Sequence, residues 1–436
     1  MKVPQNIHMV GIGGIGMSAL AQWYHARGVS VSGSDREASP TTELLESKGI
    51  RVSIGDNATN VPKETELLIY SDAVPAENVE RTEAKKQGVT EQSYFEALGD
   101  VTENHFTIAV AGSHGKTTTT AMLAKVLRDI GHEPTAIVGS LVKDFDGSNF
   151  LAGDGNLFVV EACEYKDHML KLAPTILIVT NLEWDHTDYF KTFDQLKKSF
   201  IKAVKKLPPE GTLVVDLKTD IGRELASHAA CSVVDYQIYR SPALNLLGTF
   251  NENNAKAAKA AVRAYAPDVP EVDIDHSLEQ FHGSWRRFEY KGDAPHGSPV
   301  YDDYAHHPTE IIATLREVKK KFPDTYVVVA FHPHLYSRTR DLMEEFSRAF
   351  INADEVLLIP IYPAREEPIE GVTSAALAER INSNGTRATA VKDFAEAEAR
   401  LRKYDGPGTL LITMGAGDIY KVADMLAASR RARPDA

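Results

Sequence analysis

Residues 7–16 read IHMVGIGGIG, an apolar run that leads into a glycine-rich turn of the form G-x-G-x-x-G. The run predicts a buried strand over 7–12, and residues 15–27 predict the helix that follows it. Glycines at such a turn let the backbone approach a pyrophosphate at the helix N-terminus, where free N–H groups and the helix dipole favour anions. Asp35 comes 19 residues after Gly16, where an acidic residue would meet a ribose hydroxyl. The stretch therefore predicts a nucleotide diphosphate site, and the alternative is tight packing of the strand against the helix with no ligand.

The alternation of apolar runs with helical segments recurs along the 436 residues and predicts an α/β fold with parallel, doubly wound sheets. It restarts after the polar stretch at 100–104 and again near 281–288. A chain of this length suggests two or three domains at about 150 residues each. We expect three: residues 1–104 as a Rossmann-like domain, 105–283 as a P-loop ATPase-like parallel sheet, and 284–436 as a second Rossmann-like domain. The last residues, 429–436, are expected to fray.

Composition narrows the class of protein. The 48 basic and 61 acidic residues give a formal charge of −13, which argues against a general nucleic-acid-binding protein. Two cysteines, Cys163 and Cys231, argue against a secreted disulfide scaffold and indicate a reducing compartment. No apolar run approaches the roughly 18–20 residues of a membrane span, and the N-terminus lacks the pattern of a signal peptide. We therefore expect a cytoplasmic protein without a membrane or nucleic-acid partner.

A second phosphate-binding motif follows the apolar run at 106–110. Val110 stands where a full Walker motif has its first glycine, but the turn keeps a glycine-rich nest, a lysine for β- and γ-phosphates and a hydroxyl for Mg²⁺. Two phosphate-binding turns on separate sheets indicate two phosphorylated substrates rather than one dinucleotide cofactor. The nucleotide-binding residues predicted here are Gly112, Ser113, His114, Gly115, Lys116, Thr117 and Thr118.

Acidic and imidazole groups follow two further predicted strands. Glu161 ends the apolar run at 157–160, at the edge where ligands bind in open α/β sheets, and a carboxylate oxygen suits Mg²⁺ beside ATP. His186 follows the strand at 176–179, where it is either a ligand of a second metal ion or a structural histidine.

Beyond residue 283 the sequence is rich in polar groups at predicted strand ends. Trp285-Arg286-Arg287-Phe288 is either a solvated arginine pair or the source of an arginine that reaches a transferring phosphoryl group. Residues 301–310 and 331–340 each follow a strand. The adjacent His306 and His307 do not predict a metal site, because neighbouring side chains rarely point at one ion.

At these residues the sequence resembles the Mur ligases, ATP-dependent amino-acid ligases of peptidoglycan synthesis. The resemblance covers nearly the whole chain, and it is greatest to the members that join L-alanine to UDP-N-acetylmuramate. It implies that ATP phosphorylates the muramyl carboxylate and that the amine of alanine attacks the acyl phosphate. Leu335 departs from the arginine that these members usually carry, and Phe250 from a histidine. The motifs that carry the resemblance are GIGGIGM, GSHGKTTTT, TNLEWDHTDY, WRRF, DDYAHHPTE, PHLYSRT and GAGDIY.

The resemblance implies a role for each motif residue. The catalytic group comprises Lys116, Glu161, His186, Arg287 and His306. The nucleotide site adds Asn251, Asn254 and Asp303 to the phosphate-binding turn, with Arg287 at the γ-phosphate. Mg²⁺ is expected on Thr117, Glu161 and His186. The sugar nucleotide and amino acid are expected at Gly13, Gly14, Ile15, Gly16, Asp35, Ser71, Tyr304, His306 and Arg338.

Three alternatives remain at the level of the sequence. A family member that joins a tripeptide to the same sugar nucleotide has a similar N-terminal half. An NAD-dependent Rossmann oxidoreductase would account for Gly11 to Gly16 but not for the Gly-Lys-Thr turn, Glu161 or the third domain. A nucleotide-gated binding protein without catalytic activity would not need Arg287 together with Glu161. We expect a monomer or a weak homodimer.

Overall fold

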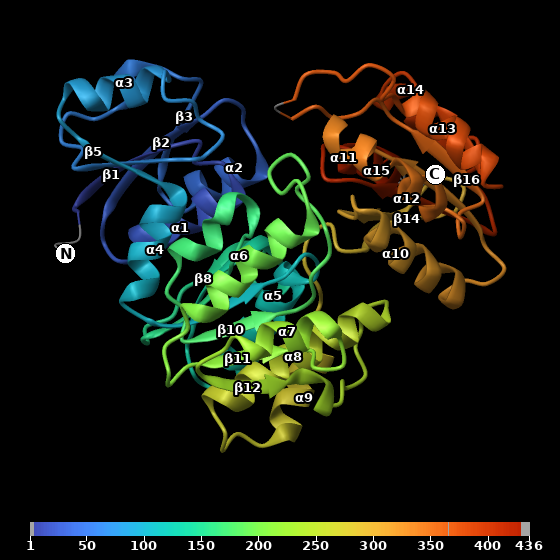
Figure 1. Cartoon of the computed structure of the whole chain (residues 1–436). Coiled ribbons are helices and arrows are strands. Elements are labelled where there is room, and N and C mark those ends of the chain that lie inside the picture. Colours follow the sequence, from blue (N-terminus) through green and yellow to red (C-terminus); the bar gives the residue numbers. More distant parts are fainter. Residues whose placement is uncertain (1–3, 365, 429–436) are drawn as a thin grey trace, which may run out of the picture. The chain divides into compact units, whose positions relative to one another are not determined.

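The computed structural model describes residues 4–364 and 366–428, so the predicted fraying of 429–436 lies outside the described residues. The predicted α/β class is confirmed, because the chain forms three sheets made mostly of parallel strands (Figure 1). The chain divides into two compact units. The first unit comprises residues up to Leu182, Leu196–Asn245 and Glu252–His282, and the second comprises Glu183–Gln195, Leu246–Asn251 and the residues from Gly283 onward.

The first sheet has five parallel strands in the order β3-β2-β1-β4-β5. Its central strand β1 is buried from Ile7 to Val10 and leads directly into the glycine-rich turn and helix α1. The strands are β1 (Asn6–Val10), β2 (Ser30–Asp35), β3 (Arg51–Ile54), β4 (Leu67–Tyr70) and β5 (Thr90–Ser93). The helices are α1 (Ile15–Ala26), α2 (Pro40–Ser47), η1 (Ala58–Asn60), α3 (Val79–Lys86) and α4 (Tyr94–Glu103).

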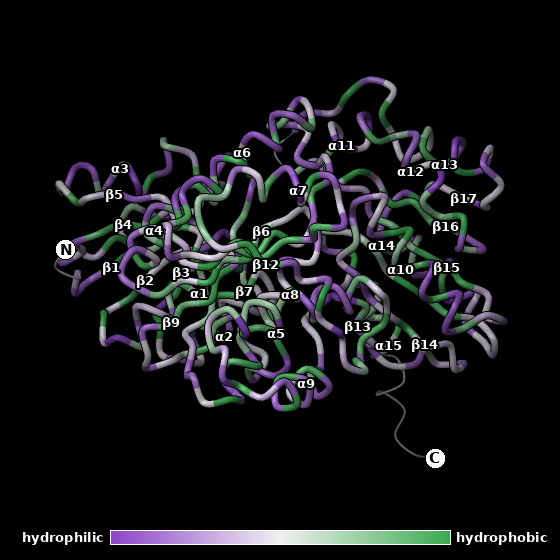
Figure 2. The backbone as a smooth tube through the Cα atoms, turned by 60° about the horizontal axis from the view of Figure 1, so that its bottom comes forward, coloured by the Kyte–Doolittle hydropathy of each residue, from purple (hydrophilic) through white to green (hydrophobic). Residues whose placement is uncertain are grey.

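The second sheet has seven strands in the order β12-β11-β10-β6-β9-β7-β8. Strand β6 is mostly hydrophobic (Figure 2) and leads into the phosphate-binding turn and α5. The strands are β6 (Phe106–Ala111), β7 (Thr135–Val142), β8 (Ser148–Leu151), β9 (Leu157–Glu161), β10 (Ile176–Val179), β11 (Thr212–Val215) and β12 (Ser232–Asp235). The helices are α5 (Lys116–Asp129), η2 (Lys143–Phe145), η3 (Tyr165–Lys171), α6 (Phe193–Lys205), α7 (Asp220–Ser227), η4 (Tyr236–Ile238), α8 (Thr249–Tyr265) and α9 (Glu271–Glu279).

The third sheet has six strands in the order β13-β14-β18-β15-β16-β17. Phe331, Phe346 and Phe350 are fully buried in the core on one side of it. The strands are β13 (Glu289–Asp293), β14 (Pro299–Asp303), β15 (Tyr326–Phe331), β16 (Glu355–Leu358), β17 (Arg387–Ala390) and β18 (Thr409–Met414). The helices are α10 (Pro308–Lys321), α11 (Tyr336–Asp341), α12 (Met343–Ala349), α13 (Ser374–Ser383), α14 (Phe394–Leu401) and α15 (Tyr420–Ala428).

Two edge strands differ from the all-parallel expectation. Strand β8 pairs antiparallel with β7, and β13 pairs antiparallel with β14. Each joins its neighbour through a short connection, which permits only antiparallel pairing because a parallel pair needs a long crossover. The other pairs in the three sheets are parallel, so the doubly wound prediction holds for the strands that carry the glycine-rich turns.

A buried polar contact joins the first two sheets within the first unit. Asn149 on β8 is fully buried, and its Nδ2 donates to the Ser18 hydroxyl on α1 at 2.9 Å. Gln22, also on α1, donates to the Asn149 Oδ1 at 3.0 Å and accepts from the Ser148 hydroxyl at 3.1 Å. Buried polar groups are costly unless satisfied, so this network favours one arrangement of the two sheets. The domain boundaries at 104 and 283 stay a prediction.

Among the described residues, no helix is both long and apolar enough to cross a membrane.

Candidate functional site

The phosphate-binding turn between β6 and α5 depends on two glycines with left-handed backbone. Gly112 has φ +132° and Gly115 has φ +82°, values that side-chain-bearing residues rarely adopt. A Cβ atom on Gly112 would lie 2.1 Å from the Thr180 hydroxyl, and one on Gly115 would lie 2.3 Å from Oδ1 of Asn254. The turn thus requires glycine for both backbone conformation and space. It also places Asn254, a predicted nucleotide contact, directly against the loop.

Asn181 holds the turn from the end of β10. Its Oδ1 accepts from the His114 N–H at 2.9 Å, and its Nδ2 donates to the His114 carbonyl at 3.0 Å. The Ser113 N–H also donates to the Asn181 carbonyl, at 3.1 Å. Asn181 lies within the TNLEWDHTDY stretch, and no role for it was predicted from the sequence. Its position directly after a central strand was the signal that could have identified it.

Lys116, the first residue of α5, is held by three acceptor groups. Its Nζ donates to the carbonyls of Gly112 at 2.6 Å and Ser113 at 3.2 Å, and to Glu164 at 3.0 Å. Burial alone would lower the pKa of Lys116, but the negative groups around it, Glu164 first among them and Glu161 as well, together outweigh burial, and the net pKa lies above its usual value. The lysine is therefore charged. Glu164 was not anticipated from the sequence.

Thr117 and Glu161 come together as predicted for a cation site. The Thr117 hydroxyl donates to Oε2 of Glu161 at 2.9 Å, and the Gly139 N–H donates to the same oxygen at 2.9 Å. A hydroxyl and a carboxylate side by side next to a phosphate-binding turn are the hard oxygen donors that Mg²⁺ prefers. These two residues fit the ion. Thr118 is buried on the same helix.

The turn after β1 is closed by Asp35. The Gly13 N–H donates to Oδ2 of Asp35 at 2.8 Å, so the carboxylate predicted to meet a ribose also braces the turn. A Cβ on Gly13 would lie 2.9 Å from that oxygen, and one on Gly16 would lie 2.6 Å from the ring of Tyr94. Packing therefore explains both glycines without a ligand, and ligand binding by Gly13, Gly14, Ile15, Gly16, Asp35 and Ser71 stays a prediction.

In the second unit, the adjacent Arg286 and Arg287 have different environments. Arg286 is buried, has φ +60°, and donates to Asp302 at 2.7 Å and to the carbonyls of Gly415 and Gly417 at 2.6 and 2.7 Å. Arg287 is half-buried, with its guanidinium 5.2 Å from the centre of the Tyr304 ring. Arg286 thus stabilises the fold through these bonds. Arg287 remains the candidate for contacting the transferring phosphoryl group.

Asp303 and His306 follow strand β14 and have strongly shifted pKa values. Burial raises the pKa of Asp303 to about 7, although its Oδ1 accepts from the Ala305 N–H at 2.7 Å. Burial lowers the pKa of His306 to about 4. His306 Nδ1 lies 3.0 Å from the Tyr304 carbonyl, which can only accept, so Nδ1 carries the proton. At neutral pH His306 is therefore uncharged, with Nε2 in its basic form.

Arg338 on α11 forms a buried ion pair with Asp185. Its Nε donates to Oδ1 of Asp185 at 3.0 Å, and a terminal nitrogen lies 3.1 Å from Nδ1 of His334. Burial would raise the pKa of Asp185, but Arg338 keeps it well below its usual value. Leu335 is buried and has φ +73°. At the position where the family members usually carry an arginine, this chain therefore has a buried apolar side chain.

The remaining predicted residues of the second unit lie on two segments. His186 has φ +53°, and its N–H donates to Oδ1 of Asp185 at 2.6 Å. Asn251 donates to the Leu247 carbonyl at 2.7 Å. Roles for both in metal or adenine binding stay predictions.

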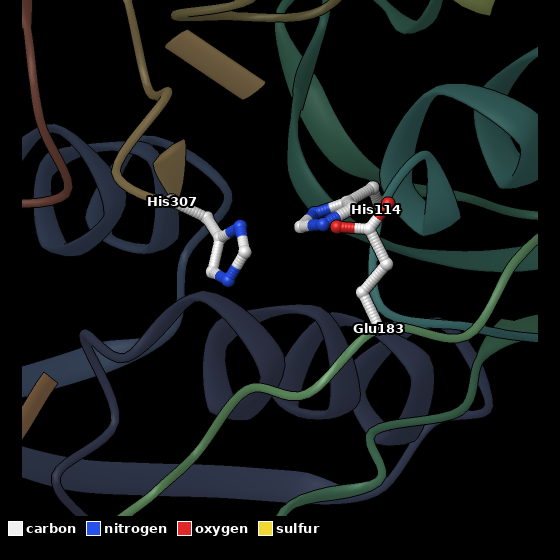
Figure 3. A group of neighbouring side chains, drawn as sticks. All are labelled: His114, Glu183 and His307. Atoms are coloured by element: carbon white, nitrogen blue, oxygen red, sulfur yellow. The ribbon is translucent and has the colours of Figure 1, made fainter. Parts of the chain in front are cut away.

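Figure 3 labels Glu183 and His307 of the second unit, and His114 of the first. Glu183 accepts from the Thr309 hydroxyl at 2.6 Å. His307 donates from Nε2 to the Trp184 carbonyl at 3.3 Å, and its Nδ1 accepts from the Thr309 N–H at 3.4 Å. His307 therefore caps α10.

Three family models match successive parts of the chain. They are the Mur ligase family catalytic domain over residues 6–106, the Mur ligase middle domain over 110–243 and the Mur ligase glutamate ligase domain over 286–417. The UDP-N-acetylmuramate–L-alanine ligases of Clostridium botulinum and Clostridium acetobutylicum are 36% and 35% identical, over 97% of this chain and 97% of theirs.

Solved structures show the same architecture. The UDP-N-acetylmuramate–alanine ligase of Thermotoga maritima matches with a TM-score of 0.82 and 26% identity, covering 98% of this chain and 99% of that one. A murein peptide ligase from Psychrobacter arcticus matches with a TM-score of 0.74 over 99% of this chain, but at 23% identity it supports the fold alone. The identity to the curated relatives spans nearly the whole sequence, and the chain belongs to the Mur ligase family.

Proposed function

We propose that this protein joins L-alanine to UDP-N-acetylmuramate at the expense of ATP, a step in making peptidoglycan precursors. The observation that carries the proposal is the phosphate-binding turn, where charged Lys116 lies beside the Thr117–Glu161 pair. Relatives named for this reaction are 36% identical over 97% of the chain. A dehydrogenase does not need such a turn, and a nucleotide-gated binding protein would not need Arg287 together with Glu161.

ATP is the phosphoryl donor in the proposed reaction. The turn from Gly112 to Thr118 holds its phosphates, and Lys116 balances the charge that develops on the β- and γ-oxygens. Thr117 and Glu161 would hold Mg²⁺, with His186 near a second ion. When bound, the ion would neutralise phosphate charge. Asn251, Asn254 and Asp303 are proposed to contact the nucleoside, and Arg287 the γ-phosphate.

The carboxylate of UDP-N-acetylmuramate takes the phosphoryl group and becomes an acyl phosphate. The sugar nucleotide is proposed to bind at the turn after β1, between Gly13 and Gly16, with Asp35 and Ser71. The amine of alanine then attacks the acyl carbon, and phosphate leaves from the tetrahedral intermediate. Tyr304, His306 and Arg338 are proposed to receive the amino acid. In its neutral form, His306 can accept a proton at Nε2.

The proposed division of labour follows the three sheets. Residues 1–104 would bind the sugar nucleotide, 105–283 ATP, and 284–436 the amino acid. Two free cysteines, Cys163 and Cys231, fit a cytoplasmic location. We expect a monomer or weak homodimer, and neither nucleic acid nor membrane as a partner.

The test is a panel of acceptors with ATP and UDP-N-acetylmuramate, read by phosphate release. We expect release with L-alanine and little with most other amino acids, with L-serine and glycine measuring the effect of Leu335. Release with the tripeptide instead would assign the murein-peptide activity. No release with any acceptor, in a chain that binds ATP, would contradict ligase function.

A further inference from the structure

Lys116 uses all of its ammonium protons within the protein. A lysine ammonium has three protons, and Lys116 Nζ has three acceptor groups: the carbonyls of Gly112 and Ser113, and the carboxylate of Glu164. A phosphate oxygen that bonds to Lys116 must therefore replace one of them. The two carbonyls belong to the backbone of the turn itself. Glu164 is the partner that can leave by moving a side chain.

Glu164 is well placed to compete with phosphate. It is 1% exposed, and both carboxylate oxygens lie 3.0 Å from Lys116 Nζ. A carboxylate and a phosphate are both anions that a buried ammonium attracts strongly, so the presence of one weakens the binding of the other. The strength of this ion pair therefore affects the affinity of the turn for nucleotide.

The position of Glu164 is fixed by the segment that follows it. Lys166 and Asp167 have φ +52° and +62°, an uncommon backbone for two consecutive residues that are not glycine. The Asp167 N–H donates to the Glu164 carbonyl at 3.0 Å, and the Asp167 side chain bonds to the hydroxyl of Ser199. The backbone from Glu164 to Asp167 is therefore held in one conformation.

The far end of the same segment reaches the first sheet. Nε2 of His168 lies 2.5 Å from Oδ2 of Asp72, and the ring stacks on Phe95 at a centroid distance of 3.7 Å. The hydrogen bond from His168 lowers the pKa of Asp72. Asp72 follows Ser71, whose Cβ would lie 3.0 Å from a Cβ on Gly11. The segment thus runs from the phosphate-binding lysine to the edge of the first glycine-rich turn.

We propose that Glu164 is a positioning residue that competes with ATP for Lys116, and that the Asp72–His168 pair loosens this hold when UDP-N-acetylmuramate binds. Binding of one substrate therefore raises the affinity for the other, and by linkage the effect is equal in both directions. This inference rests on the proposed function, because it takes ATP and UDP-N-acetylmuramate as the ligands of the two turns.

The test measures the affinity for a non-hydrolysable ATP analogue by calorimetry, with and without saturating UDP-N-acetylmuramate. In the parent chain the sugar nucleotide is expected to tighten the analogue several-fold, within the range of about 5–150-fold typical of such coupling. Glu164→Gln keeps the shape but removes the charge, so the analogue alone is expected to bind about tenfold tighter. The enhancement by sugar nucleotide should then fall close to one.

Asp72→Asn provides the second arm, and its partly exposed side chain makes misfolding a small concern. We expect it to reduce the enhancement, and the double variant to behave like Glu164→Gln because both act along one path. Glu96→Gln is the matched control. It removes the charge from another contact to the same segment, the 2.7 Å bond that Glu96 on α4 accepts from Lys171, and should leave the enhancement at the parent value.

The outcomes separate the two proposals. Tighter analogue binding in Glu164→Gln, together with lost enhancement in both variants, supports the inference. Unchanged or weaker analogue binding in Glu164→Gln, or full enhancement in Asp72→Asn, overturns it. A parent chain that binds neither ATP analogue nor sugar nucleotide would instead overturn the proposed function.

Discussion

The phosphate-binding turn of the second sheet and the strand ends of the third sheet organise polar groups in different ways. The turn relies on backbone: Gly112 and Gly115 adopt left-handed conformations, and Asn181 holds the loop through its main chain. The third sheet relies on side chains, because burial raises the pKa of Asp303 to about 7 and lowers the pKa of His306 to about 4. The first arrangement fixes the backbone of the turn, and the second sets protonation states.

This difference matches the chemistry expected at each place. Phosphate groups carry charge that does not depend on a protein proton, so a rigid set of N–H donors and one lysine suffices. An amine that attacks an acyl phosphate must lose protons, so neutral groups such as His306 are useful near it. Buried side chains of this kind also cost folding free energy. The two regions should therefore respond differently to mutation.

The largest expected effect is on stability, in the third-sheet region. Arg286→Ala leaves the fully buried Asp302 without its guanidinium partner. Breaking a buried pair in this way costs about 3–5 kcal/mol. Urea unfolding should show this loss, while Arg287→Ala, at a half-buried neighbour, should change stability by less than about 1 kcal/mol.

Arg286→Ala and Arg287→Ala also distinguish an effect on folding stability from an effect on the rate of phosphate release. Arg287→Ala is expected to lower the rate of phosphate release by about 10²–10³-fold if its guanidinium meets the transferring phosphoryl group. Equal losses of stability in the two variants would show that Arg287 contributes as much to folding as the buried, ion-paired Arg286, contrary to what their environments indicate. A near-parent rate in Arg287→Ala would remove it from the site.

In the phosphate-binding turn the largest effect is on rate. Lys116→Ala is expected to reduce acyl-phosphate formation by about 10²–10³-fold, because the charge on the β- and γ-oxygens loses its ammonium partner. Phosphate release in the presence of both other substrates is the measurement. Lys198→Ala, on the exposed face of α6, is the control and should keep the parent rate. Near-parent release by a folded Lys116→Ala variant would refute the role.

These two regions also differ in how far the sequence could predict them. Gly112 and Gly115 stand in a recognisable pattern because backbone conformation and space exclude other residues there. Glu164 and Asp185 are not part of any such local pattern. They reach Lys116 and Arg338, which are 48 and 153 residues away, and only the fold brings each pair together. For the same reason, the sequence alone could not tell Arg286 from Arg287.

For the turn of the first sheet, the sequence could not decide between packing and ligand binding, because both require glycine at the same positions. Gly16→Ala would place a Cβ 2.6 Å from the Tyr94 ring, and such overpacking costs about 1–3 kcal/mol. Gly14→Ala meets nothing closer than 3.4 Å, has an ordinary backbone, and should be nearly neutral for stability. Thermal unfolding of the two variants tests this. Equal midpoints would mean that Tyr94 can move aside.

A third substitution asks whether the turn also binds a ligand. Gly13→Val would push a side chain against Asp35 and Thr42 and block the approach of a diphosphate. We expect weaker binding of UDP-N-acetylmuramate in calorimetry, while an ATP analogue alone binds as in the parent chain. Unchanged sugar-nucleotide affinity, or binding of NAD, would count against the assignment.

The smallest expected effect is a pair of opposed pH dependences in the third-sheet region. The pKa of Asp303 is raised to about 7, so the folded chain binds an extra proton between about pH 4 and 7, and this contribution to stability falls as pH rises. The pKa of His306 is lowered to about 4, so its contribution rises with pH over nearly the same interval. In the parent chain the two slopes largely cancel.

A variant that lacks one of the two groups should show the pH dependence of stability that the other group contributes. Relative to the parent chain, Asp303→Asn should gain stability as pH rises from about 4.5 to 6.5, and His306→Gln should lose it, each by no more than ~1.4 kcal/mol per pH unit. Urea unfolding across that interval is the measurement, and the difference from the parent removes every other titrating group. Slopes of the same sign would mean that burial does not shift these two groups in opposite directions. If neither variant shows a slope, the protonation of these two groups does not change on folding. The contrast between a turn built from backbone and a site built from side chains would then not hold.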